Sequence, residues 1–313
     1  DGVPARFIGP LLADLVCHEV GHTLGLRHNF KASSLYSLAE INSPELKGKK
    51  SFTASVMDYS PINIDMTGNK GAQGDYAMIG VGPYDMWAIE YGYSFAKDLK
   101  PILARSTEPE NQFCTDEDTS GADPLARRYD FTSNPLEYAE SQMKLALHHR
   151  DKILTDFVKD GDSWAKARTG YNITLSTQMR AISMMSNWLG GAYIHRDKKG
   201  DKGKRAPIQV VAAKKQRDAL SFIIDNSFTP EAFGLNPELV SHLTVDKWYD
   251  AGGFAGLLSD STYPINDRVS NIQASILTQI MNPTTLIRIY DNECRVAPDA
   301  DCITLPEVLR TIR

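Results

Sequence analysis

The stretch that decides how this chain folds is His18-Glu19-Val20-Gly21-His22-Thr23-Leu24-Gly25-Leu26-Arg27-His28. Residues four positions apart lie on nearly the same face of a helix, so His18 and His22 can present two imidazole rings to one metal ion. Gly25 can take the left-handed conformation that ends a helix and returns the chain, which brings His28 toward the same ion. The spacing therefore predicts a metal site with three histidine ligands.

The donor set predicts which metal binds and what it does. Three neutral imidazoles that leave a fourth position open are typical of catalytic zinc sites, whereas structural zinc sites are closed and usually contain cysteine. Glu19 lies about 100° round the helix from His18, so its carboxylate is expected beside the Zn²⁺ ion and not on it. There it can accept a proton from a zinc-bound water, whose pKa falls from 15.7 to about 7. We expect peptide-bond hydrolysis with Glu19 as general base.

A second motif, Ser55-Val56-Met57-Asp58-Tyr59, resembles the Met-turn of the metzincin zinc endopeptidases, and the histidine motif is similar to theirs. The resemblance implies that Met57 packs beneath the three histidines without binding the metal. It also implies that Tyr59 stabilises the oxyanion near the zinc. The alternative is that Met57 and Tyr59 are ordinary core residues that follow a strand.

Two further segments, Gly74-Asp75-Tyr76-Ala77 and Gly82-Pro83-Tyr84-Asp85-Met86-Trp87-Ala88-Ile89, extend the likeness. With them, the chain is similar to the zinc-dependent metalloproteases of Bacteroidetes and related bacteria that carry a C-terminal domain of unassigned function. The resemblance implies action on protein or peptide substrates. We expect a secreted, periplasmic or outer-membrane-associated protein.

Composition excludes several classes of protein. The 313 residues are 42% hydrophobic and 23% charged, as in ordinary globular proteins. A net charge of -5 argues against a nucleic-acid partner, because neutralising phosphates needs a basic face. No apolar run is long enough to cross a bilayer, so no transmembrane segment is expected.

The region before the motif is short. In metzincins a sheet precedes the zinc helix, and Asp1 to Cys17 cannot supply one. We therefore expect this chain to be the C-terminal portion of a longer protease, with the missing N-terminal part of the same protein as its partner. A helix is expected to start near Pro10. Leu11, Leu12, Leu15 and Val16 are expected on or beside its buried stripe.

The predicted fold class is mainly α. Residues 1–97 are expected to form a metzincin-like catalytic core that lacks its N-terminal sheet, completed by a helix from Pro83 to about Tyr91 that Gly92 ends. Residues 98–313 are expected to form a mostly helical C-terminal domain. Its apolar periodicity predicts helices over 134–158, 163–189, 212–226, 267–281, 283–291 and 305–312.

An acidic stretch between these regions partly resembles a calcium loop. Asp116, Asp118, Ser120 and Asp123 could supply oxygen ligands to Ca²⁺, but Arg127 stands where an EF-hand needs glutamate. The alternative is a solvated acidic loop. The basic run 196–205 is predicted to be a solvated loop that proteases can cleave. His148 and His149 are predicted to be surface residues.

The four cysteines are the residues that could indicate the cellular compartment of the protein. Cys294 and Cys302 flank a short loop and could form a disulfide, which would suit an envelope or extracellular setting. Cys17 is expected to be a buried thiol and Cys114 to stay free.

Two other functions remain open. One is a protein- or glycan-binding helical scaffold with a vestigial zinc site, although an intact Glu19 argues against a decayed site. The other is a zinc amidase that acts on cell-wall peptides.

Overall fold

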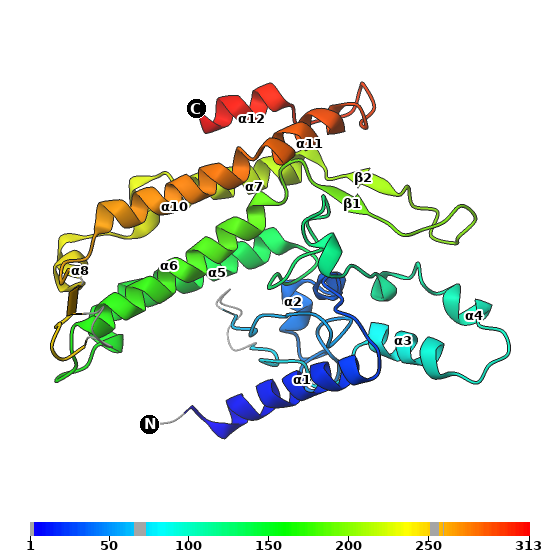
Figure 1. Cartoon of the computed structure of the whole chain (residues 1–313), viewed down its shortest axis with the longest axis horizontal. Coiled ribbons are helices and arrows are strands. Elements are labelled where there is room, and N and C mark those ends of the chain that lie inside the picture. The colour runs from blue at the N-terminus through cyan, green and yellow to red at the C-terminus, as the bar shows by residue number, and fades with distance from the viewer. Residues whose placement is uncertain (1–2, 66–72, 251–256, 259) are drawn as a thin grey trace. The chain divides into compact units, whose positions relative to one another are not determined.

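A computed structural model of the chain describes residues 3–65, 73–250, 257–258 and 260–313. The fold is mainly α, as predicted (Figure 1). Contacts between residues divide it into two units. The first comprises residues 1–138, 190–212 and 295–300, and the second comprises residues 139–189, 213–294 and 301–313. The first unit runs past residue 97 to Tyr138, and the catalytic core of residues 1–97 stays a prediction.

The first unit combines short helices with long irregular segments. Its elements are α1 (Ala5–Thr23), η1 (Ala32–Leu35), α2 (Leu38–Ile41), α3 (Pro83–Tyr93), α4 (Lys100–Leu103), η2 (Pro109–Asn111), η3 (Asp116–Asp118), β1 (Ala192–Ile194) and β2 (Ile208–Val210). The two strands pair antiparallel, with Tyr193 opposite Gln209. This small sheet was not predicted, because each strand is only three residues long.

Helix α1 differs from the prediction in two ways. It begins at Ala5, and Pro10 lies inside it instead of at its start. Leu12, Leu15 and Val16 are exposed by 56%, 55% and 59%, so their predicted burial is wrong. Only the side of α1 that carries His18 and Gly21 is buried. Apolar periodicity predicts a helix, but it does not reveal which face of the helix packs against the rest of the protein. In α1 that face carries the histidines.

The core of the first unit forms where three distant segments meet. Ala54 donates its backbone N–H to Ala32 and accepts one from Tyr84, at 3.0 and 2.9 Å. A Cβ at Gly82 would lie 2.0 Å from the carbonyl oxygen of Ala54, so this close approach requires glycine. Partly buried apolar side chains surround this point: Leu35, Trp87, Ala88 and Phe113.

The second unit is helical. Its elements are α5 (Pro135–Asp151), which begins in the first unit, η4 (Ile153–Phe157), α6 (Ala165–Ser186), α7 (Ala213–Asp225), η5 (Pro230–Phe233), α8 (Pro237–His242), α10 (Ile265–Ile280), α11 (Pro283–Glu293) and α12 (Leu305–Ile312). Helix α6 contacts α7, α8, α10 and η4, and it forms the centre of this unit (Figure 1).

Most helices of the second unit lie within a few residues of their predicted bounds. The exception is the helix expected over residues 134–158, where α5 ends at Asp151 and a wide π-turn follows. In this turn Phe157 donates its N–H to the carbonyl of Lys152. A Cβ at Gly170 on α6 would lie 3.0 Å from the Phe157 ring, so α6 passes close to the turn. His148 and His149 are exposed, as predicted.

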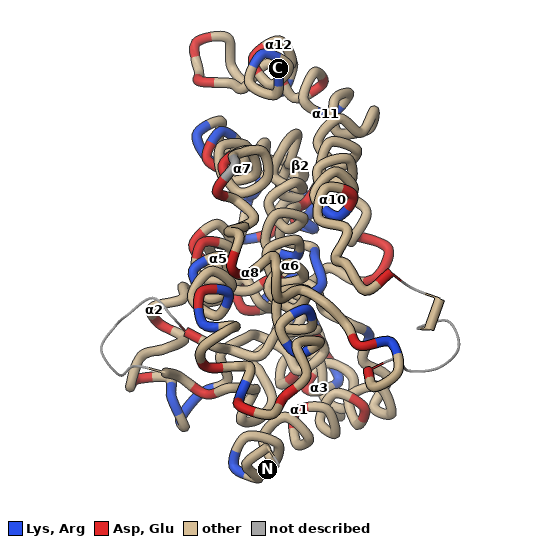
Figure 2. The backbone as a smooth tube through the Cα atoms, turned by 90° about the vertical axis from the view of Figure 1, so that its left-hand side faces the viewer, with Lys and Arg blue, Asp and Glu red and all other residues tan. Residues whose placement is uncertain are grey.

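Charged residues of both signs lie together on α7, and all four cysteines are free. Figure 2 shows basic and acidic residues side by side along α7, where Lys214 pairs with Asp218 at 2.7 Å. Cys294 and Cys302 are both free, so the predicted disulfide is absent. Cys114 is free and buried, whereas Cys17 is only half-buried. Among the described helices none is long and apolar enough to cross a bilayer. The envelope or extracellular location stays a prediction.

Candidate metal centre

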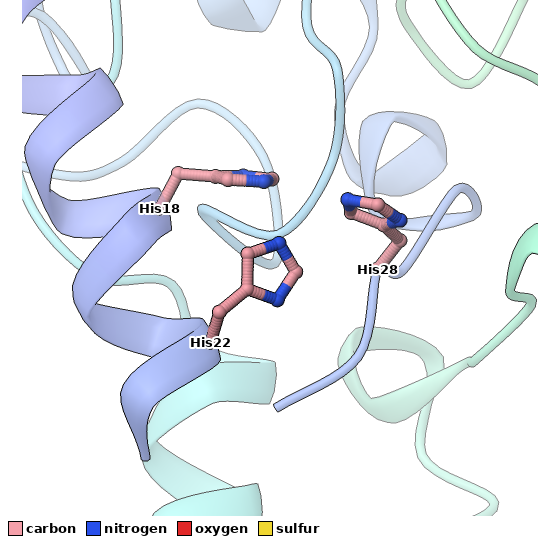
Figure 3. A group of neighbouring side chains, drawn as sticks. All are labelled: His18, His22 and His28. Atoms are coloured by element: carbon pink, nitrogen blue, oxygen red, sulfur yellow. The ribbon is translucent and has the colours of Figure 1, made fainter. Parts of the chain in front are cut away.

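The three motif histidines come together. His18 and His22 project from α1, and His28 projects from the segment that follows it, with the three rings facing one space (Figure 3). One ligand atom from each residue lies within 4.8 Å of the other two. Within the described part of the chain this is the one group of His, Cys, Asp or Glu residues that meets the geometry of a metal site.

The bend after α1 is built as predicted. Gly25 has a φ of 84°, the left-handed conformation that glycine adopts without strain. The N–H of Gly25 donates to His22 and that of Leu26 donates to Gly21, both at 3.0 Å. These two bonds form a Schellman motif, which ends the helix and turns the chain so that His28 faces the first two ligands.

Each imidazole is anchored through its Nδ1 atom. Nδ1 of His18 lies 2.7 Å from the carbonyl oxygen of Val56, and Nδ1 of His22 lies 3.0 Å from that of Leu26. Nδ1 of His28 lies 2.9 Å from a carboxylate oxygen of Asp116. These oxygens only accept, so each Nδ1 carries the proton and each Nε2 keeps a lone pair for a metal.

Burial favours the neutral, metal-binding form of His18. The side chain is buried, and desolvation lowers the pKa of this imidazole because the charged form loses its hydration. Three neutral nitrogen donors fit zinc, which binds imidazole readily and keeps an open position when only three protein ligands are present.

Met57 lies against the histidine helix. Its side chain is fully buried, and a Cβ at Gly21 would lie 2.3 Å from its sulfur atom. The carbonyl of Met57 accepts a hydrogen bond from the N–H of Asn29 at 3.0 Å, which ties this turn to the residue after His28. The absence of a side chain at Gly21 therefore leaves room for Met57, and Asn29 holds the turn by its hydrogen bond. Neither role was predicted.

Asp85 supports the carbonyl that anchors His18. The N–H groups of Val56 and Gly82 donate to its carboxylate at 2.9 and 2.8 Å, and the Ser55 hydroxyl donates to its other oxygen. Burial raises the pKa of Asp85, and these donors oppose that shift. The sequence offered one signal for this residue, an acid in the first turn of a helix that begins Gly-Pro.

Tyr59 and Glu19 are placed differently. The Tyr59 hydroxyl lies 3.0 Å from Nε2 of His28, the atom that is free to bind a metal. Glu19 is an exposed residue of α1 that follows His18, and its charge acts on the His18 imidazole by raising its pKa, against the larger effect of burial. Tyr59 therefore contacts the ring of His28, and Glu19 is the neighbour of His18 in the sequence.

The acidic stretch does not form a common cation site. The Asp116 carboxylate binds His28 and Arg128, and these contacts lower the pKa of Asp116. Asp118 pairs with Arg196 at 2.7 Å, and Asp123 pairs with Lys31 at 2.6 Å. Each carboxylate already faces a basic side chain, so the calcium prediction finds no support. The side chains of Asp116 and Asp118 are 37% and 32% exposed, in keeping with the alternative of a solvated acidic loop, whereas Asp123 is buried.

Comparison with known proteins identifies the family. No curated protein and no solved structure matches the chain. A family profile described as Met-zincin matches residues 1–313, the whole length of both units. This family suggests zinc metalloprotease chemistry, in agreement with the three histidines. The chain belongs to the Met-zincin family.

Proposed function

We propose that this chain is a zinc-dependent endopeptidase in which His18, His22 and His28 hold Zn²⁺ and Glu19 transfers protons. The observation that carries the proposal is the anchoring of all three rings through Nδ1, at 2.7, 3.0 and 2.9 Å, which leaves three Nε2 atoms for the metal. Rings that served only as core packing would not need this common orientation.

Each residue of the proposed site has a separate chemical role. Zinc, when bound, polarises the scissile carbonyl and lowers the pKa of water to about 7. Glu19 accepts the proton that the attacking water loses, and it delivers that proton to the nitrogen of the leaving amine. The Tyr59 hydroxyl, now bonded to Nε2 of His28, donates instead to the oxyanion that develops on the carbonyl oxygen.

Casein hydrolysis by the full-length gene product tests this proposal. Glu19→Ala is expected to lower kcat by about 10² to 10⁴ and to leave zinc content unchanged. Glu140→Ala, which removes an exposed glutamate from α5, is the matched control and is expected to keep full activity. Equal activity of wild type and Glu19→Ala would reject the enzyme and favour a scaffold with a vestigial zinc site.

The substrate class needs a separate measurement. Profiling the cleavage products of a mixed peptide library is expected to give internal cuts in ordinary peptides. Cleavage confined to cell-wall peptides would reject the endopeptidase and favour the amidase.

The N-terminal part of the same protein stays a proposed partner. The exposed side of α1 carries Leu12, Leu15 and Val16, an apolar surface that such a part would cover. We expect the backbone amides of α1 to exchange hydrogen more slowly in the full-length gene product than in this chain. Equal exchange in both would oppose this contact.

A further inference from the structure

The third histidine needs support that the first two do not. His18 and His22 are spaced by the α1 helix itself, whereas His28 lies beyond the helix end, on the segment 28–30. Two of the three rings donate to neutral backbone carbonyls, and only His28 donates to a charged group, the carboxylate of Asp116. This difference singles out Asp116.

The side chains around His28 form a connected cluster. One oxygen of Asp116 accepts from Nδ1 of His28 at 2.9 Å, and the other accepts from Arg128 at 2.8 Å. The Arg128 guanidinium lies 4.9 Å from the centre of the Phe30 ring. The Phe30 ring in turn stacks on His28, with centroids 5.0 Å apart and planes at 29°. Asp116 is therefore held from one side by Arg128 while it orients the imidazole on the other.

The backbone of the same segments holds this cluster together. The N–H of Phe30 donates to the carbonyl of Cys114 at 2.7 Å, and the N–H of Arg127 donates to that of Phe30 at 3.0 Å. The N–H of Tyr129 donates to Tyr59 at 3.1 Å. The stretch 112–129 thus encloses the segment that carries the third ligand.

The neighbouring acidic residues do not share this role. Asp118 closes the η3 turn by accepting from the N–H of Thr115 at 2.8 Å, so the turn does not depend on the Asp116 carboxylate. Glu117 forms an exposed pair with Arg27. Of the three consecutive acids, only Asp116 contacts a proposed zinc ligand.

We propose that Asp116 is the positioning residue of the third zinc ligand, and that Arg128 keeps its carboxylate in place. This inference rests on the proposed zinc site. The carboxylate fixes the protonated Nδ1 tautomer and the plane of the His28 ring, so that Nε2 points to the metal, and its negative charge strengthens the ligand. Loss of such a partner typically weakens metal binding about 10- to 100-fold.

Zinc affinity of the metal-free chain, measured by competition with a chromophoric chelator, tests the proposal. Asp116→Ala is expected to weaken Zn²⁺ binding about 10- to 100-fold, and Asp116→Glu, which keeps the carboxylate, is expected to recover part of the loss. Arg128→Gln is expected to cause a smaller loss. Glu117→Gln, in the same turn, is the matched control and is expected to bind zinc like the wild type.

A cobalt spectrum separates positioning from a merely structural role. At saturating Co²⁺, the visible absorption of Asp116→Ala is expected to differ from that of the wild type, because the His28 ring is no longer fixed. Wild-type affinity and an unchanged cobalt spectrum in Asp116→Ala would overturn the inference while leaving the zinc site intact. A wild-type chain that binds no zinc would overturn the proposed function and this inference together. If Asp116→Ala fails to fold, Asp116→Asn, which removes the negative charge, is measured in its place, and wild-type affinity with an unchanged cobalt spectrum in that variant would likewise overturn the inference.

Discussion

The two units bury very different side chains. Among the described residues, the first unit buries five Lys or Asp side chains: Lys31, Asp58, Asp85, Asp123 and Asp130. In the described part of the second unit the buried charged residue is Arg150. The second unit instead packs apolar side chains around α6, among them Ile153, Tyr171, Leu175, Phe233, Leu239 and Leu243.

This difference shows what holds each unit together. In the first, Lys31 donates to Asp123 at 2.6 Å and to the carbonyl of Ile194 at 3.2 Å, while Asp123 accepts from the N–H of Ile194. One buried pair thus fixes β1 to the segment after His28. Irregular backbone needs such specific bonds, because it has no helical hydrogen bonds of its own to satisfy its buried groups. In the second unit, Arg150 donates to neutral oxygens of Thr174, Gln178 and Ala232.

Breaking the buried pair of the first unit is expected to give the largest effect. Lys31→Met leaves the Asp123 charge buried without its partner, and this should lower the free energy of unfolding by about 3 to 5 kcal/mol. Urea unfolding, followed by probes of each unit, measures the loss. Lys50→Met, at an exposed lysine of the same unit, is the control and should change little. A loss below about 1 kcal/mol would mean that buried ion pairs do not hold this unit.

Truncation of a core side chain in the second unit is expected to give the next largest loss of stability. Ile182 is fully buried on α6, so Ile182→Ala should lower the free energy of unfolding by about 2 to 4 kcal/mol. Because this residue belongs to the second unit, zinc affinity should stay at the wild-type value. A parallel loss of zinc affinity would contradict this expectation.

The same contrast explains what the sequence could and could not predict. The helices of the second unit follow apolar periodicity, so that α10 was expected over 267–281 and spans Ile265–Ile280. The three histidines and Glu19 belong to one short motif in which spacing carries the signal, whereas the roles of Met57 and Tyr59 were expected from the resemblance to the Met-turn. Asp116 lies 88 residues from His28, and no local pattern marks a contact that long-range folding creates. The exposed side of α1 was missed because periodicity does not reveal which face is covered.

The pH dependence of stability gives a smaller, sharper test. Asp58 and Asp130 are buried on either side of Ser33, which donates its N–H to Asp58 and its hydroxyl to Asp130. Burial raises the pKa of Asp58 to about 7 and raises that of Asp130 as well, with Arg127 opposing the second shift. The folded state therefore holds protons that the unfolded state releases.

It follows that the first unit should lose stability as the pH rises from about 4 through about 7, by up to about 1.4 kcal/mol per pH unit for one such proton. Asp58→Asn imitates the protonated acid, so its thermal unfolding should depend less on pH over this range. An equally steep dependence in the variant would contradict the burial argument.

The smallest effect is expected at an exposed network of the second unit. Arg217 on α7 pairs with Asp301 and with Glu307 on α12, and all three side chains are partly exposed. Water and salt screen such pairs, so Arg217→Ala should shift the melting temperature only slightly, and less still at high salt. A shift as large as that of Lys31→Met would erase the distinction between buried and exposed pairs.

The central claim is that three imidazole nitrogens hold one zinc ion. X-ray absorption of the chain loaded with one equivalent of Zn²⁺ tests it most directly. The expected spectrum has three histidine nitrogens at about 2.0 to 2.1 Å, at least one further light-atom ligand and no sulfur. His28→Ala should remove one histidine from that count. A sulfur ligand near 2.3 Å, or a wild-type spectrum with fewer than three histidines, would contradict the account.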